Sequence, residues 1–131
     1  MSNEIDPVAL ECRRLEALDS FDVLDTPSEE SFDRVTRLAR RAFGVAMATV
    51  TFVDAHRQWF KSRPGVSISE TARDIAVCDH TIREAKPLIV PDMREDARFR
   101  DYPYVKADPF IIFYAGVPLI TAEGIAVGTF C

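Results

Sequence analysis

With 131 residues and a mass of 14.7 kDa, the chain is large enough to bury one hydrophobic core and too small for two ordinary domains. Its 16 Lys and Arg residues against 21 Asp and Glu residues give a net charge of −5, which disfavours nucleic acid and anionic lipid as partners. The opening MSNEIDP does not resemble a signal peptide, and no apolar stretch is long enough to span a membrane. We therefore expect a cytoplasmic protein that binds neither nucleic acid nor membrane.

Residues 6–21 carry apolar side chains at steps of three and four, which predicts a helix with one apolar face. That face consists of Val8, Cys12, Leu15, Leu18 and Phe21. The helix either packs on its own domain or pairs with a second copy through Val8, Leu15 and Leu18. We take residues 1–25 as a leading helix and linker, and we expect a weak homodimer.

A second helix is predicted to start at a capping box. In Thr26-Pro27-Ser28-Glu29 the threonine hydroxyl can accept a backbone hydrogen bond and the glutamate can return one, with proline at the first helical position. Gly44 is the expected left-handed residue at the end of this helix. The predicted buried face consists of Phe32, Val35, Leu38, Ala39, Ala42 and Phe43.

Strand patterns follow the second helix. Residues 46–53 are rich in β-branched and aromatic side chains, and residues 58–63 alternate, so the short turn between them predicts an antiparallel pair. Residues 66–76 show no regular pattern. The remaining predicted elements are a short helix at 77–85 and strands at 88–90, 111–120 and 125–131.

The stretch 91–110 contains three prolines and charges of both signs, which is typical of a functional loop or lid. Four aromatic side chains are expected to hold it against the domain: Phe99, Tyr102, Tyr104 and Phe110. Helices on a mostly antiparallel sheet predict an α+β fold. Because the last strand pattern has no cap or polar tail, we expect the domain to be truncated at its C-terminal end.

Residues that indicate chemistry are few. The five glycines form no phosphate-binding loop, and two histidines are too few for a three-histidine metal site. The sequence therefore identifies no catalytic residue and no metal site. Cys78 and His80 come nearest to a reactive pair, but their spacing of two points them in different directions on a helix. That spacing favours a small buried cysteine and a locally hydrogen-bonded histidine.

Several long strings resemble one known family. They are QWFKSRPGVSISETARDIAVCDHTI, LIVPDMREDARFRDYPYV and FYAGVPLITAEGIAVGTFC, preceded by RLEALDSFDVLDTPSEESFDRVTRLA. From about Arg14 to Cys131 the chain resembles a GAF domain of the type found N-terminally in bacterial sensor proteins, such as diguanylate cyclases and histidine kinases. The resemblance implies that residues 26–131 form an antiparallel sheet of about five or six strands with helices on both faces. It also implies a small-molecule pocket on one face.

The candidate ligand-binding residues combine aromatic walls with a few polar groups, the usual lining of a small-molecule site. They are Phe52, Trp59, Phe60, Arg73, Asp74, His80 and Phe113. Arg73 and Asp74 are equally well interpreted as a structural ion pair. The motifs of the family's cyclic-nucleotide-binding and bilin-binding members are missing, so the resemblance identifies neither a ligand nor a cofactor.

Two functions remain. One is a non-catalytic sensory module in which a ligand biases the helices that lead to an output domain. The other is a small thiol-dependent enzyme, similar to a methionine sulfoxide reductase, that uses Cys78. Such chemistry needs a second thiol near the first, and the sequence offers only Cys12 in the leading helix and Cys131 at the last position. We therefore favour the sensory module.

Overall fold

The computed structural model describes residues 6–131, which contain one sheet of six strands. The spatial order is β3-β2-β1-β6-β5-β4, and each neighbouring pair runs antiparallel. The predicted α+β fold and the predicted pairing of the last two strands are confirmed. The strands are β1 (Val50–Val53), β2 (Arg57–Ser62), β3 (Glu70–Ala72), β4 (Leu88–Val90), β5 (Tyr114–Ile120) and β6 (Ala126–Phe130).

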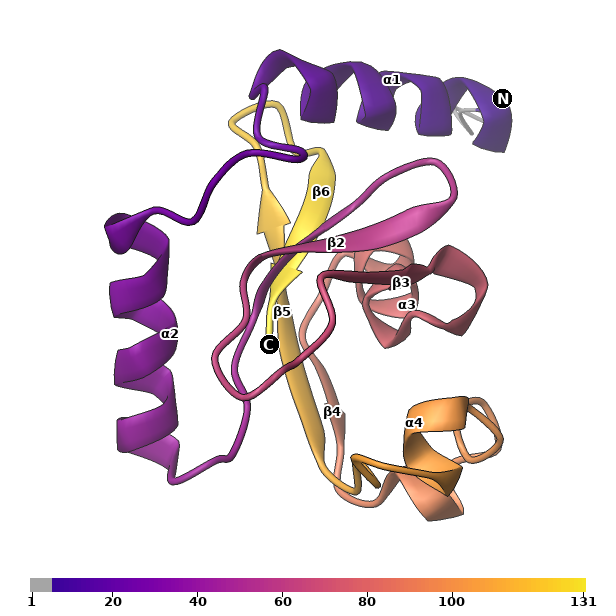
Figure 1. Ribbon diagram of the computed structural model, residues 1–131. Helices are drawn as coiled ribbons and strands as arrows, with labels where there is room; N and C mark the ends of the chain where they lie inside the picture. Colours follow the sequence, from indigo (N-terminus) through magenta and orange to yellow (C-terminus); the bar gives the residue numbers. More distant parts are fainter. Residues whose placement is uncertain (1–5) are drawn as a thin grey trace.

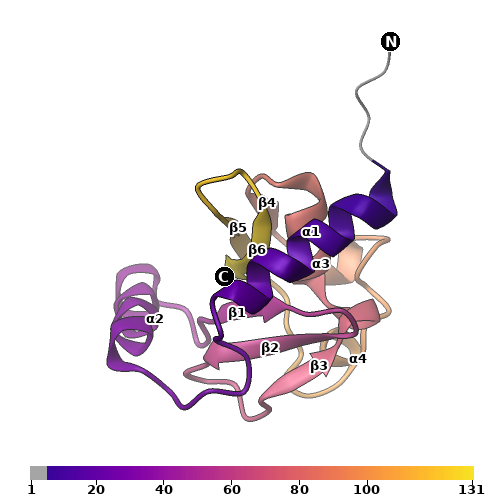
Figure 2. The same cartoon turned by 90° about the horizontal axis from the view of Figure 1, so that it is seen from above.

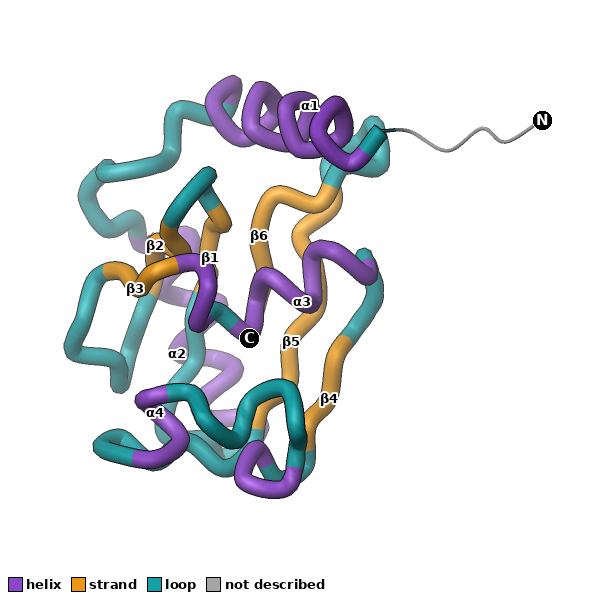
Figure 3. The backbone as a smooth tube through the Cα atoms, turned by 90° about the vertical axis from the view of Figure 1, so that its right-hand side faces the viewer, coloured by secondary structure: helices purple, strands orange, loops and turns teal. Residues whose placement is uncertain are grey.

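Helices cover both faces of the sheet, as predicted (Figure 1). On one face α2 (Glu30–Phe43) packs beside β2, and on the other α3 (Val77–Glu84) packs against β5 and β6. The short α4 (Pro103–Lys106) lies on the side of α3, which faces the viewer in Figure 3. The first helix, α1 (Pro7–Ser20), crosses the end of the sheet near the β5–β6 turn, as Figures 1 and 2 show.

The leading helix packs on its own domain. The Asp6 carboxylate accepts a hydrogen bond from the backbone N–H of Val8 at 3.1 Å and caps α1. Leu18 is buried in a core cluster with side chains of β1 and β2, whereas Val8 is exposed. Leu18 is therefore unavailable for the predicted seam with a second copy, because its burial stabilises this domain instead. Residues 1–5 of the predicted linker lie outside the described residues.

The predicted start of the second helix is wrong. The helix begins at Glu30, and Glu29 precedes it without a side-chain cap. The Thr26 hydroxyl instead accepts a hydrogen bond from Lys61 Nζ at 2.7 Å, and Glu29 Oε2 lies 2.7 Å from the same nitrogen. The Lys61 side chain is fully buried, and a buried ammonium needs oxygen partners, so this contact takes the hydroxyl that would have capped the helix.

The predicted apolar face of α2 is also wrong. Its one buried residue is Thr36, whose Oγ1 lies 2.8 Å from Ser62 Oγ. A bulge in β2 leaves Lys61 as an extra residue opposite β1. Both Lys61 and Ser62 therefore face α2, so the helix meets the sheet through polar contacts. The left-handed Gly44 after the helix is confirmed, with φ of 63°. Four of the six predicted buried side chains are exposed: Val35, Leu38, Ala42 and Phe43.

Two segments without a predicted helix or strand contain short regular elements. Residues 70–72 of the stretch 66–76 form β3, which pairs with β2 at the edge of the sheet and leads into a 3₁₀ turn at Arg73–Ile75. In the stretch 91–110 the Phe99 side chain is fully buried, as an anchor of that segment should be. Phe110 is exposed and does not anchor the segment, contrary to the prediction.

Candidate functional site

The structure distributes the seven candidate residues over both faces of the sheet. Phe52 and Trp59 are buried on the face of the sheet that α2 covers, in the cluster that contains Leu18. Alternation along β2 places Phe60 on the opposite face from Trp59. Phe113 precedes β5 and is exposed. The aromatic candidates therefore do not line one common pocket.

Two clefts lie on the α2 side. The first, of about 810 Å³, is lined by Phe52 of β1 and by Phe21 and Val23 from the connection between α1 and α2. The second, of about 620 Å³, lies between α2 and β2, and its lining includes Trp59 and Phe60. Phe52 therefore lines one cleft, and Trp59 and Phe60 line the other.

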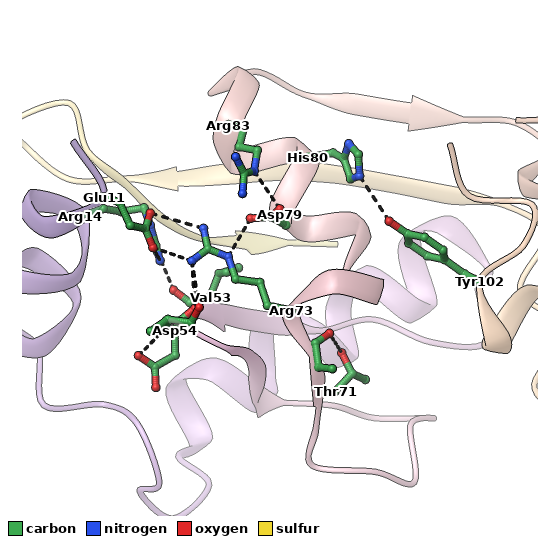
Figure 4. A network of polar contacts seen from close by, with 12 residues as sticks. Glu11, Arg14, Val53, Asp54, Thr71, Arg73, Asp79, His80, Arg83 and Tyr102 are labelled. Atoms are coloured by element: carbon green, nitrogen blue, oxygen red, sulfur yellow. Dashed lines mark hydrogen bonds and ion pairs between the residues drawn. The ribbon is translucent and has the colours of Figure 1, made fainter. Parts of the chain in front are cut away.

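Two polar candidates, Arg73 and His80, lie on the side of α3 and contact different partners (Figure 4). Arg73 comes from the 3₁₀ turn after β3, and its Nε donates to Asp79 Oδ1 in α3 at 2.9 Å. Its Nη1 donates to Glu11 Oε1 in α1 at 2.5 Å. The same nitrogen lies near the carbonyl oxygens of Asp54 and Ala55 after β1. Arg73 thus joins α1, the end of the sheet and α3 through one guanidinium group.

A second arginine completes this network. Arg14 is buried, its Nη1 donates to the carbonyl oxygen of Val53, and its other nitrogens donate to both oxygens of Glu11 at 2.8 Å. Hydrogen bonds from Arg14 and then Arg73 lower the pKa of Glu11 to about 2. Burial opposes the charged form of Arg73, but its hydrogen bonds to Glu11 and Asp79 outweigh burial and raise its pKa. No sequence pattern indicated the contact between Arg73 and Glu11, because 62 residues separate the partners.

His80 forms the end of an aromatic chain. Its Nε2 lies 3.3 Å from the Tyr102 hydroxyl, and its ring meets Phe99 edge to face at 4.8 Å between centroids. Phe99 in turn meets Tyr102 edge to face, and burial raises the pKa of Tyr102. The predicted local hydrogen bond of His80 is therefore wrong, because its partner Tyr102 lies 22 residues further along the chain, in the segment 91–110. Asp74, the last of the candidates, is exposed beside Arg73.

We expect the Glu11 carboxylate to make stability depend on pH. Its folded-state pKa lies below the ordinary value of 4.5, so the stabilisation is present above pH 4.5 and is lost as the pH falls toward 2. Because a third of the side chain is exposed, the loss should be about 1–2 kcal/mol. Measured by urea unfolding between pH 5 and 2.5, the free energy of unfolding of Glu11→Gln should fall by that much less than the wild-type value. Glu16→Gln, exposed on the same helix, is the control, and an equal acid loss in all three proteins would contradict the expectation.

Comparisons with known proteins show the family of this chain. A sequence model of the GAF domain matches residues 27–131. The chain belongs to the GAF domain family. Over 114 residues this GAF domain is 37% identical to a cyclic di-GMP phosphodiesterase of Pseudomonas aeruginosa, which covers 87% of the chain. The chain spans only 19% of that relative's length.

Solved structures show the same fold at low sequence identity. The crystal structure of the A. Aeolicus nlh2 GAF domain in an inactive state has a TM-score of 0.62 at 14% identity, covering 94% of this chain and 78% of the other. A free methionine-R-sulfoxide reductase from Neisseria meningitidis has a TM-score of 0.61 at 16% identity, covering 99% and 76%. At these identities the likeness concerns the fold alone.

The described residues contain neither a cluster of metal ligands nor a helix able to span a membrane. Within residues 6–131, no three His, Cys, Asp or Glu side chains are grouped closely enough to hold a metal ion. None of the helices in that part of the chain combines the length and the hydropathy that crossing a bilayer requires.

Proposed function

We propose that this GAF domain is a non-catalytic sensory module of a bacterial signalling protein. In this proposal residues 26–131 bind a small molecule, and the bound ligand biases the helices that lead to an output domain. The 37% identity to a cyclic di-GMP phosphodiesterase supports an output domain that acts on cyclic di-GMP. The cytoplasmic location and the homodimer predicted from the sequence belong to the same proposal.

The observation that carries this proposal is the Arg73 bridge. The guanidinium group contacts Asp79 of α3 and Glu11 of α1, so a ligand that moves α3 changes what holds α1. Arg73, Asp74 and His80 therefore remain our candidates for the ligand side of the module. Phe52, Trp59, Phe60 and Phe113 remain candidates for apolar contacts, but Phe52 and Trp59 lie on the other face of the sheet and belong to a separate site. A ligand changes how α1 is held only if it binds one arrangement of α3 and α1 more tightly than the other.

Amide hydrogen exchange tests the bridge. In Asp79→Asn the pair with Arg73 is weakened, and the amides of α1 should exchange roughly tenfold faster, as expected for a loss of about 1.4 kcal/mol in local stability. Arg83→Ala removes only the exposed partner on the other oxygen of Asp79 and serves as the control, with α1 unchanged. Identical exchange of α1 in Asp79→Asn and wild type would refute coupling through Arg73.

One observation favours the alternative, a thiol-dependent enzyme. Cys131 Sγ lies 3.8 Å from Cys78 Sγ, so a second thiol is present where the sequence pattern indicated none. Against it, Cys78 is only 4% exposed, which restricts a substrate's access to its sulfur. Repeated turnover of free methionine-R-sulfoxide with a dithiol reductant, followed as methionine release, would favour the enzyme over the sensory module.

A further inference from the structure

Two cysteines that lie 53 positions apart in the sequence meet under α3. Cys78 lies in the first turn of α3, and Cys131 directly follows β6, next to β1. Their sulfur atoms are 3.8 Å apart, against about 2.05 Å in a disulfide. Cys78 is buried and Cys131 half-buried, whereas the third cysteine, Cys12, is exposed on α1. The pair and the lone thiol therefore differ in surroundings within one chain.

Hydroxyl groups surround the two sulfurs. Thr129 Oγ1 donates to Cys78 Sγ at 2.9 Å, and the Tyr114 hydroxyl lies 3.4 Å from that sulfur. On the other side Thr49 Oγ1 lies 2.8 Å from Cys131 Sγ. Such donors stabilise a thiolate, which is the nucleophilic form of cysteine.

Cys78 acts as the hydrogen-bond donor and Cys131 as the acceptor. The hydrogen bond from Cys78, helped by Thr49, lowers the pKa of Cys131 to about 6. The same bond and burial raise the pKa of Cys78. The pair therefore favours the thiolate at Cys131 and the proton at Cys78.

We propose that Cys78 and Cys131 are a redox site that forms a disulfide on exposure to a hydroperoxide. The Cys131 thiolate attacks a peroxide oxygen, the O–O bond breaks, and the leaving oxygen takes a proton to become an alcohol or water. The resulting sulfenic acid is attacked by the Cys78 sulfur, the S–O bond breaks, and water leaves with the thiol proton. Two electrons pass from the two thiols to the peroxide, and a dithiol reductant returns them.

The disulfide would fix α3 to the end of β6. Asp79 directly follows Cys78 and holds Arg73, so the cross-link acts on the residue that connects α3 to α1. This consequence rests on the proposed sensory function, whereas the disulfide itself does not. The two are measured separately: thiol chemistry by mass spectrometry, and its effect on α1 by hydrogen exchange.

Peptide mapping of the wild-type chain tests the site without any substitution. The reduced chain is treated with one equivalent of hydrogen peroxide, alkylated under denaturing conditions and digested with trypsin. We expect a cross-linked peptide that joins residues 74–83 to residues 107–131, while Cys12 in residues 1–13 stays alkylable, so that three free thiols become one. Full alkylation of all three cysteines, or a disulfide that involves Cys12, would overturn the proposal.

Variants assign the order of events. In Cys78→Ser the reaction should stop at a Cys131 sulfenic acid that dimedone traps, and in Cys131→Ser the buried Cys78 should stay reduced. Cys12→Ser is the matched control, with an unchanged yield of disulfide. A Cys78 sulfenic acid in Cys131→Ser, formed as fast as oxidation of the wild type, would refute Cys131 as the first thiol to react.

Discussion

Replacing Gly128 with alanine is expected to destabilise the domain by at least about 3 kcal/mol, because the new methyl group has no space. Gly128 lies in β6 between Phe52 of β1 and Leu119 of β5. A Cβ atom there would lie 2.0 Å from the Thr51 carbonyl oxygen and 3.1 Å from the Phe52 Cα atom. These are backbone atoms of the neighbouring strand, so β1 and β6 must separate to accept the side chain.

Urea unfolding followed by far-UV circular dichroism measures this loss. Gly124→Ala is the matched control: this glycine has φ of 82° in the β5–β6 turn, and its added methyl group would meet no atom within 4 Å. It should cost only the strain of a left-handed alanine, about 1 kcal/mol. If Gly128→Ala unfolded at the same urea concentration as Gly124→Ala, the close approach of β1 to β6 would be wrong.

Phe99→Ala is expected to cost about 3–5 kcal/mol, the usual range for a large side chain removed from a core. Phe99 is fully buried in a cluster with Val90 and Met93, and it contacts the rings of His80 and Tyr102. The substitution removes the ring that meets His80 edge to face and leaves a cavity in this cluster.

The matched control comes from the same segment. Phe110 is 59% exposed, so Phe110→Ala should change the free energy of unfolding by less than about 0.5 kcal/mol. Thermal and urea unfolding of both variants give the comparison. Equal losses in the two would show that the segment 91–110 is held by Phe110 as well, as the sequence pattern predicted and the structure does not indicate.

The local sequence pattern was enough to predict most strands of the sheet. Alternating and β-branched residues predicted the strands around β1, β2, β5 and β6, and short turns predicted that consecutive strands pair. These features depend on neighbours in the chain, and turn residues fix the pairing of adjacent strands. The three-residue β3 was missed, since so short an edge strand exists only through its pairing with β2.

The candidate site could be predicted only in part. Residue type drew attention to Arg73, His80 and Cys78, and each has polar or sulfur contacts in the structure. Their partners could not be found in the same way. Glu11 is one of many acidic residues on a helix surface, and Tyr102 is one of several aromatic residues in a loop pattern.

Periodicity and turn residues act over short distances, so they were enough to predict the main helices, most strands and the antiparallel pairing. The family was indicated by the resemblance of the long motifs. Long-range contacts fixed where α2 starts, which face of the sheet each aromatic residue joins, and which thiol meets Cys78. In each case a contact between distant residues overrode the local preference. The buried Lys61 took the Thr26 hydroxyl from the helix, and the return of β6 beside β1 brought Cys131 under α3.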